Sequence, residues 1–345
     1  MASALAKLRK RLGFSCPIEE KLGKTIASSL PGELCRHFSL DEIKTATDNF
    51  NEELIVGVGG FGPVYKGFID EGNPRTMAIK RLNPSSKQGA PEFSTEILLL
   101  CQIRYVHLIQ LIGYCYDERE MILVYDFMAN GTLRCHLYDT QRDSLLWKQR
   151  LQICIGAARG LHYLHSGLKH LVIHRDVKTT NILLDNKLVA KVSDFRLSKL
   201  TVRLSLDNIA DSMMVKGTFG YLEPKYIRRQ KLTEKSDVYS FDVVLLEVLC
   251  ARKALNPKLQ EEQWHLANWA RNCNKKGSIG EIIDPNLMGK IAPKCFKVYV
   301  EIAMACVQDQ RIQWPKMVDV IDKLELALEL QEKADGDAED VRTMN

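Results

Sequence analysis

The residues best suited to chemistry lie in the string HRDVKTTN, residues 174–181, and at Asp194 further along the chain. Transfer of a phosphoryl group requires a carboxylate that orients the attacking hydroxyl, oxygen ligands for the metal that bridges the phosphates, and a cation beside the transferred group. Asp176 suits the first role, Asn181 and Asp194 the second, and Lys178 the third. The string therefore predicts phosphoryl transfer from ATP with Mg²⁺ or Mn²⁺ as the metal.

A glycine-rich segment could hold the phosphates of the donor. Residues 57–64 read GVGGFGPV, in which the glycines let backbone N–H groups approach phosphate oxygens that a Cβ atom would block. The same spacing occurs in dinucleotide-binding folds and in ordinary hairpin turns. Here a strand, rather than a long helix, is expected after the third glycine, which favours a phosphate-covering hairpin. The predicted phosphate-binding residues are Gly57, Val58, Gly59, Gly60, Phe61, Gly62 and Val64.

A lysine and a glutamate follow this hairpin in the order that the same chemistry needs. Lys80 ends the next expected strand, and Glu96 lies on the helix expected after it. A lysine held by a carboxylate is a fixed cation for the α- and β-phosphates of ATP. Standing alone, the pair would be interpreted as a surface salt bridge of small energy. Its place between the two motifs makes Lys80 and Glu96 candidate catalytic residues.

The elements that must position these residues change in character along the chain. Strands are expected at 54–68, 76–81, 108–116 and 121–125, with one helix at 91–103. Long helices follow, such as 147–166 with one apolar face. This order predicts an α+β, bilobal fold with a β-rich N-lobe at 54–125, a hinge at 126–130 and an α-helical C-lobe at 131–331. The cleft between the lobes is the expected binding site.

Composition narrows the class of protein. The 345 residues are 46% hydrophobic, which is enough for a large core, and the net charge of +5 comes from dispersed residues, so nucleic-acid binding is not expected. The ten cysteines form no C-x-x-C pair, which favours reduced thiols in a cytoplasmic protein. No apolar stretch approaches the roughly 20 residues of a transmembrane helix, and no signal peptide is visible.

Both ends of the sequence differ from the expected domain. Residues 1–36 form a basic extension, expected to be flexible, although leucines at helical spacing could instead place an amphipathic helix on an anionic membrane surface. Residues 37–53 form a segment adjacent to the domain. Residues 332–345 are acidic and are expected to be disordered.

Taken in order, these motifs resemble those of the eukaryotic protein kinases over 54–331. Lys178 and the pair Gly217-Thr218 resemble the residues that serine/threonine kinases, rather than tyrosine kinases, have at these positions. The segments 147–151, 155–161 and 235–241 resemble plant receptor-like kinases, and 38–174 their malectin-receptor branch. The resemblance implies a serine/threonine kinase of protein substrates in receptor-linked signalling, with a membrane receptor or receptor-kinase complex as partner. It would be a receptor-like cytoplasmic kinase, peripheral at the plasma membrane if its N-terminus binds there, or a fragment of a receptor.

The resemblance also implies roles outside the motifs. Ala78 and Val64 would lie above the adenine and Leu183 below it, while Asp126 and Met128 would offer backbone hydrogen bonds. An arginine before the catalytic aspartate suggests control by phosphorylation of the following loop. The candidate acceptors are Thr201, Ser205, Ser212 and Thr218, although several of these hydroxyls could simply solvate the loop.

Four residues depart from the family pattern. Arg196 replaces a glycine after Asp194, where it would restrict φ and bring a cation near the metal, so we expect slower turnover or weaker Mg·ATP binding. Lys225, Asp242 and Trp314 replace a glutamate, a glycine and an arginine, and we expect them to weaken the C-lobe.

These departures support an alternative interpretation, a catalytically impaired pseudokinase that binds nucleotide and acts as a scaffold for a partner kinase. A kinase of small molecules is a third alternative, which the segment 217–221 disfavours.

Overall fold

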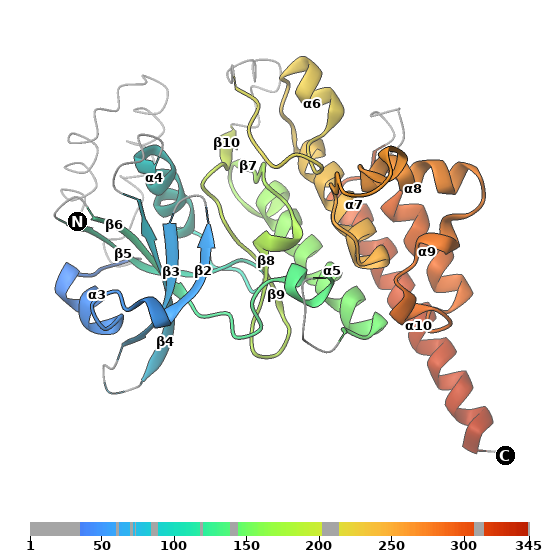
Figure 1. Ribbon diagram of the computed structural model, residues 1–345, viewed down its shortest axis with the longest axis horizontal. Coiled ribbons are helices and arrows are strands. Elements are labelled where there is room, and N and C mark those ends of the chain that lie inside the picture. Colours follow the sequence, from blue (N-terminus) through green and yellow to red (C-terminus); the bar gives the residue numbers. More distant parts are fainter. Residues whose placement is uncertain are drawn as a thin grey trace. The chain divides into compact units, whose positions relative to one another are not determined.

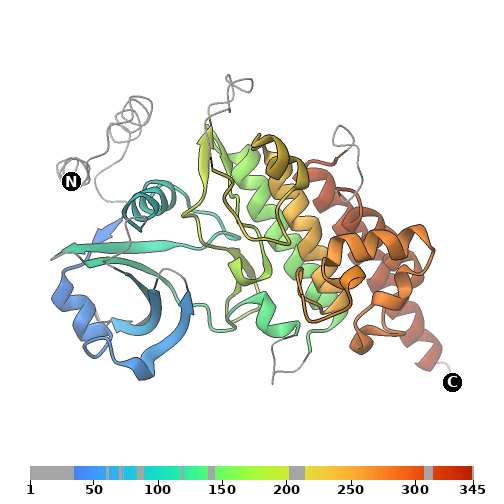
Figure 2. The ribbon, with the colours of Figure 1, turned by 45° about the horizontal axis from the view of Figure 1, so that its top comes forward.

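The computed structural model describes residues 35–59, 62–69, 72, 74–83, 89–117, 120–138, 144–201, 214–306 and 314–343. The expected basic extension therefore lies almost wholly outside the described residues. The chain divides into two compact units (Figures 1 and 2). The first runs to residue 104 and includes 110–127, and the second comprises 105–109 and the chain from 128 onward.

The first unit is built on a six-stranded sheet in the order β1-β5-β6-β4-β3-β2, antiparallel except for the parallel pair β1 and β5 (Figure 1). The strands are β1 Arg36–His37, β2 Ile55–Gly59, β3 Gly62–Ile69, β4 Arg75–Leu82, β5 Leu111–Asp117 and β6 Glu120–Asp126. The helices are α3 Leu40–Ala46, the short η1 Glu52–Leu54 and α4 Gly89–Leu100. The expected strands and the expected helix are thus present, with ends shifted by a few residues.

The segment before the expected N-lobe packs onto this sheet. Ser39 caps α3, because its hydroxyl accepts the Glu42 N–H while the Glu42 carboxylate accepts the Ser39 N–H. Phe38 and Ile43 are buried in one cluster with residues of β3, β4, β5 and β6. A Cβ atom on Gly113 of β5 would lie 2.3 Å from the Arg36 carbonyl oxygen, so glycine allows β1 to pair there.

The second unit is mainly helical. Its longer helices are α5 Trp147–His162, α6 Pro224–Arg229, α7 Glu234–Cys250, α8 Leu266–Lys275, α9 Pro293–Ala303 and α10 Met317–Thr343. Its short turns are η2 Leu133–His136, η3 Tyr163–Gly167, η4 Thr179–Asn181, η6 Glu261–Gln263, η7 Ile279–Ile282 and η8 Pro285–Leu287. Two small antiparallel pairs complete it, β7 Leu171–Ile173 with β10 Lys199–Thr201, and β8 Ile182–Leu184 with β9 Ala190–Val192.

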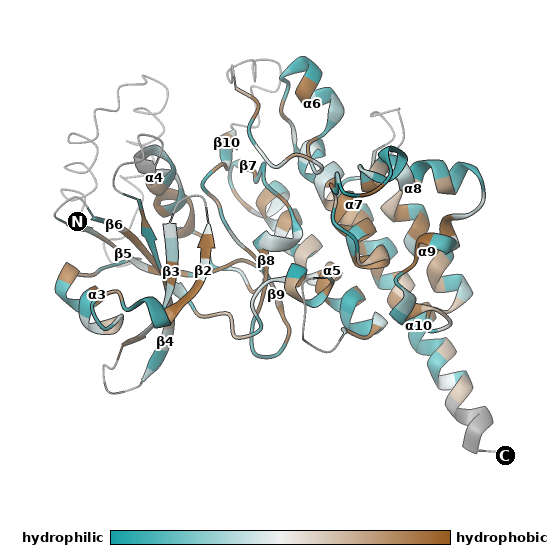
Figure 3. Ribbon diagram, in the orientation of Figure 1, coloured by the Kyte–Doolittle hydropathy of each residue, from teal (hydrophilic) through white to brown (hydrophobic). Residues whose placement is uncertain are grey.

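Helix α7 is the central element of this unit. Every residue from Ser236 to Cys250 is buried, and Figure 3 shows mostly hydrophobic colour along it. Helices α5 and α10 instead carry hydrophilic and hydrophobic residues, as helices with one buried face do (Figure 3). A polar side chain on α7 therefore needs a specific partner inside the protein.

The prediction of disorder for 332–345 is wrong for residues 332–343, because α10 continues to Thr343. Asp335 explains part of this extension: its carboxylate lies 3.1 Å from Lys148 Nζ and accepts a 2.9 Å hydrogen bond from the buried Gln331 amide. Once a packed helix exists, each further residue adds a backbone hydrogen bond with no new nucleation cost. The prediction of disorder rested on acidic composition alone and did not include these contacts.

Trp314 and Lys225, two of the residues that depart from the family pattern, lie in the second unit. The Trp314 ring is buried and stacks on Tyr239, with ring centres 5.8 Å apart. Lys235 Nζ donates to the carbonyl oxygens of Trp314 and Pro315, both at 2.7 Å. Trp314, which stands where the family pattern has an arginine, is thus held by aromatic packing. Lys225 is half-buried.

Asp242 is fully buried on α7, as its place in an apolar helix predicted. Its Oδ2 atom accepts a 2.8 Å hydrogen bond from the Cys306 backbone N–H. Burial nevertheless raises the pKa of this carboxyl from 3.8 to about 7, because hydrogen bonds from the Cys306 backbone and side chain do not replace the water that the charged form loses.

No helix in the ranges given above has both the length and the apolar character needed to cross a membrane.

The buried Asp242 predicts a pH-dependent stability difference. Between pH 4 and 7 the folded carboxyl keeps a proton that the unfolded one has lost, so its effect on stability becomes less favourable as pH rises. Relative to Asp242→Asn, the wild type should lose roughly 1.4 kcal/mol per pH unit in this window and level off above it. Thermal unfolding of both proteins from pH 4 to 8 measures this. The exposed Asp322→Asn is the control, and a difference that stays constant with pH would contradict the prediction.

Candidate functional site

A buried carboxylate on α7 holds the backbone of the catalytic string. Asp237 Oδ2 accepts the His174 N–H at 2.8 Å and lies 2.9 Å from His165 Nε2, while Oδ1 accepts the Arg175 N–H at 2.8 Å. Burial alone would raise the pKa of Asp237, but hydrogen bonds and nearby charge, led by His165, lower it overall. Arg175 adopts a left-handed φ of 72°, which these bonds stabilise. The loop before Asp176 is therefore fixed at its backbone.

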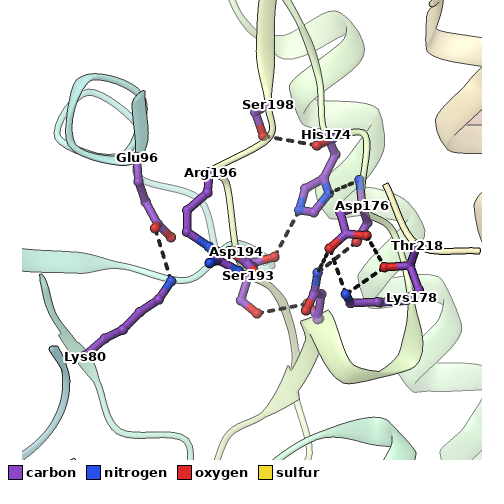
Figure 4. A network of polar contacts seen from close by, with 11 residues as sticks. Lys80, Glu96, His174, Asp176, Lys178, Ser193, Asp194, Arg196, Ser198 and Thr218 are labelled. Carbon is purple, nitrogen blue, oxygen red and sulfur yellow. Dashed lines mark hydrogen bonds and ion pairs between the residues drawn. The ribbon is translucent and has the colours of Figure 1, made fainter. Parts of the chain in front are cut away.

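Asp176 is the centre of a compact hydrogen-bonded group (Figure 4). Its Oδ1 atom accepts a 2.6 Å hydrogen bond from the Thr218 hydroxyl, and its Oδ2 atom lies 2.8 Å from Lys178 Nζ. Lys178 Nζ also donates to the Thr218 hydroxyl at 2.8 Å. The Asn181 amide donates to the Asp176 carbonyl at 2.8 Å and to Oδ2 at 3.2 Å. The Asp176 carboxylate, the Lys178 ammonium and the Thr218 hydroxyl thus lie within hydrogen-bonding distance of one another.

The loop after β9 positions Asp194. His174 Nε2 lies 3.0 Å from the Ser193 carbonyl oxygen, and the Phe195 ring is buried against the His174 ring at a centre distance of 5.1 Å. Between these two anchors Asp194 adopts a left-handed φ of 69°. The segment that carries Asp194 is therefore tied to the same histidine that precedes Asp176.

Arg196 binds both oxygens of Asp194. Its Nε atom donates to Oδ1 and its Nη2 atom to Oδ2, the latter at 2.5 Å (Figure 4). The two side chains are 10% and 17% exposed, so water screens the pair only partly. Bidentate guanidinium–carboxylate pairs are among the stronger protein hydrogen bonds. Arg196 is not among the described residues with positive φ, so an arginine fits the backbone in this conformation.

This arrangement limits what the expected metal ligands can hold. Oxygen donors such as Asn181 and Asp194 suit Mg²⁺ chemically. However, the Arg196 guanidinium donates to both Asp194 oxygens, so a metal chelated by the two oxygens together would have to displace it. As arranged, the Asp194 carboxylate does not fit a metal ion bound through both of its oxygens. Among the residues described, no cluster of three or more His, Cys, Asp or Glu side chains could bind one elsewhere.

The first unit contains the expected lysine–glutamate pair. Lys80 Nζ, on β4, lies 3.2 Å from Glu96 Oε2, on α4 (Figure 4). The Glu96 side chain is 1% exposed and that of Lys80 is 15% exposed. The partner on α4 therefore holds the ammonium within the fold, and the two side chains do not form a mere surface contact.

The glycine-rich segment is a β-hairpin of β2 and β3, as its strand context predicted. Gly57 and Gly59 have open space where a Cβ atom would be. Gly62 has a φ of +125°, and a Cβ atom there would lie 2.2 Å from the Arg81 carbonyl oxygen, so this position requires glycine. Val58 is 76% exposed. Gly60 and Phe61, at the tip, lie outside the described residues.

The residues expected around adenine lie in separate elements. Val64 is on β3 opposite Lys80, and Ala78 is on β4 opposite Tyr125. Asp126 ends β6 and forms an ion pair with Arg75. In the second unit, Leu183 is on β8, and the Met128 carbonyl accepts the Gly131 N–H at 3.0 Å.

The candidate phosphorylation sites differ in environment. Thr201 is buried in β10, with 6% exposure, and Thr218 is bonded to Asp176 and Lys178. Ser205 and Ser212 lie outside the described part of the chain. Arg175 donates to the Tyr226 hydroxyl at 2.7 Å.

A second buried carboxylate was missed in the sequence. Glu247 of α7 accepts hydrogen bonds from the hydroxyls of Tyr221 at 2.6 Å and Tyr138 at 2.7 Å, and from the Ala254 N–H at 3.1 Å. Burial raises the pKa of Glu247 to about 7. It anchors the segment that carries Thr218. The available signal was a charged residue inside the otherwise apolar stretch 243–250 of α7.

Comparison with known proteins gives consistent matches. The family model described as protein tyrosine and serine/threonine kinase matches residues 50–324. The receptor-like protein kinase FERONIA of Arabidopsis thaliana is 63% identical over 315 residues, 91% of this chain and 35% of that protein. ANXUR2 is 59% identical over 309 residues, 90% and 36%, and THESEUS 1 is 56% identical over 299 residues, 87% and 34%, both from the same plant. The chain thus spans about a third of these relatives' length.

The Glu247 contacts predict a stability loss. Tyr221→Phe removes a donor from a buried carboxylate and should lower the free energy of unfolding by about 1–3 kcal/mol. Chemical denaturation measures it. Tyr163→Phe is the matched control, because Tyr163 stacks on Tyr105 and its hydroxyl has no hydrogen bond to the residues described. Equal small losses in the two variants would contradict the assigned role of Glu247.

Proposed function

Because this chain belongs to the protein tyrosine and serine/threonine kinase family, as a FERONIA-like plant receptor kinase, we propose that it transfers the γ-phosphoryl group of ATP to serine and threonine hydroxyls of proteins. One observation carries the proposal. The Thr218 hydroxyl donates to Asp176 Oδ1 at 2.6 Å while Lys178 Nζ lies 2.8 Å from the same hydroxyl. The carboxylate is thus arranged to accept a hydrogen bond from an aliphatic hydroxyl beside a cation.

The proposed mechanism assigns one role to each side chain. The acceptor hydroxyl takes the place of the Thr218 hydroxyl at Asp176, which orients it and receives its proton. The acceptor oxygen forms a bond to the γ-phosphorus as the bond from that phosphorus to the β,γ-bridging oxygen breaks, and ADP leaves. Lys178 stabilises negative charge on the transferred phosphoryl group. Asn181 holds the Asp176 carboxylate through the 3.2 Å hydrogen bond.

The first unit would bind the rest of the nucleotide. Lys80, fixed by Glu96, would contact the α- and β-phosphates, and the backbone N–H groups of 57–64 would approach the phosphate oxygens. Val64, Ala78 and Leu183 would contact the adenine, and Asp126 and Met128 would offer it backbone hydrogen bonds. Protein kinases in general use ATP with Mg²⁺. Of the two ligands predicted for it, Asn181 and Asp194, the second is bound by Arg196, so no step is assigned to a metal here.

We further propose substrates and partners within receptor complexes at the cytoplasmic face of the plasma membrane. The support is that the relatives are named receptor-like protein kinases. The basic extension 1–36 is the candidate membrane contact.

A second function, nucleotide-binding scaffold for a partner kinase, has one observation in its favour. Arg196 occupies both oxygens of Asp194, the residue expected to bind metal. A chain with this pair could bind nucleotide and transfer phosphate only slowly.

Autophosphorylation separates the two functions. With Mg²⁺ and labelled ATP, the wild type should incorporate phosphate on serine and threonine. The rate for Asp176→Asn should be about 10² to 10⁴ times lower, because asparagine cannot accept the proton of the acceptor hydroxyl. An ATP-induced rise in melting temperature should survive in Asp176→Asn and serves as the folding control. No incorporation in either protein, with that rise intact, would favour the scaffold. Labelled tyrosine would contradict the proposed specificity.

A further inference from the structure

Arg196 has the geometry of a built-in counter-cation for Asp194. The guanidinium reaches the carboxylate from two residues along the same loop and meets both oxygens in a side-on pair. A tethered partner has a high effective concentration and loses little further freedom on contact. The pair therefore competes well against a cation that must come from solution.

The charges of the side chains around Asp194 also favour Arg196 over a cation from solution. Asp176 and Lys178 sum to zero, and so do Asp194 and Arg196. With a neutral residue at position 196 the four positions would carry a net charge of −1. A polyphosphate approaching them would then need an added cation, since like charges repel strongly where water is partly excluded. With Arg196 present, the Asp194 charge is already neutralised.

We propose that Arg196 takes the place of a metal ion at Asp194, so that ATP binds to this chain without a divalent cation. The inference rests on the nucleotide site proposed above and concerns the cation requirement of that site. It accounts for the disagreement between oxygen ligands that suit Mg²⁺ and a carboxylate that is already bound.

Calorimetric titration of ATP into the full chain, with EDTA or with excess Mg²⁺, tests this. For the wild type the two dissociation constants should agree within about threefold. For Arg196→Gly and Arg196→Gln, binding in EDTA should be at least about tenfold weaker than with Mg²⁺, because a strong charge-assisted pair no longer neutralises Asp194. Arg159→Ala is the control, since it removes an exposed arginine that pairs with Glu325 and should behave as the wild type.

Each other outcome overturns the inference in a recognisable way. Wild-type binding that requires Mg²⁺ as strongly as the variants contradicts it and leaves the kinase proposal intact. A change in Arg196→Gly without the same change in Arg196→Gln assigns the effect to backbone freedom, not charge. No ATP binding by any of these proteins, with or without Mg²⁺, removes the nucleotide site itself and the inference with it.

Discussion

The Asp237 carboxylate is the constraint on which the second unit's chemistry depends. It bonds the backbone of His174 and Arg175, and so fixes the loop that ends at Asp176. His174 in turn contacts Ser193 and Phe195, which flank Asp194. One buried anion on α7 thereby positions both acidic residues of the candidate site. The low dielectric around it strengthens these bonds, and losing one would leave a buried charge poorly solvated.

Helix α7 shows that buried acids can serve different purposes. Glu247 receives two tyrosine hydroxyls and an amide N–H, and so anchors the segment leading to Thr218. Asp242 has one backbone donor and a raised pKa, and nothing in its contacts suggests a benefit to the site. Helix α7 therefore carries one buried carboxylate, Glu247, that helps to position the site, and another, Asp242, whose burial is unfavourable for the fold.

Much of the fold and part of the candidate site could be predicted from motif spacing. These features depend on the order of residue types along the chain. The hairpin, the Lys80–Glu96 contact, the two-part secondary structure and the membership of the receptor-like kinase branch all follow from residue types in sequence. Contacts between residues that are far apart in the sequence could not be predicted from such patterns. The stacking of Trp314 on Tyr239 is one example, and the ordering of the acidic end of α10 by Lys148 is another. For Arg196, the sequence indicated a cation near the metal site but not that both Asp194 oxygens would be bound.

The pairing of Arg196 with Asp194 is the observation behind the proposal that a guanidinium takes the place of a metal ion in this chain. Anomalous diffraction from crystals grown with ATP and Mn²⁺ would locate the cation directly. We expect no manganese peak at Asp194, with Arg196 still bound to both carboxylate oxygens. A strong peak within bonding distance of Asp194, with the guanidinium displaced, would contradict the exchange of metal for arginine.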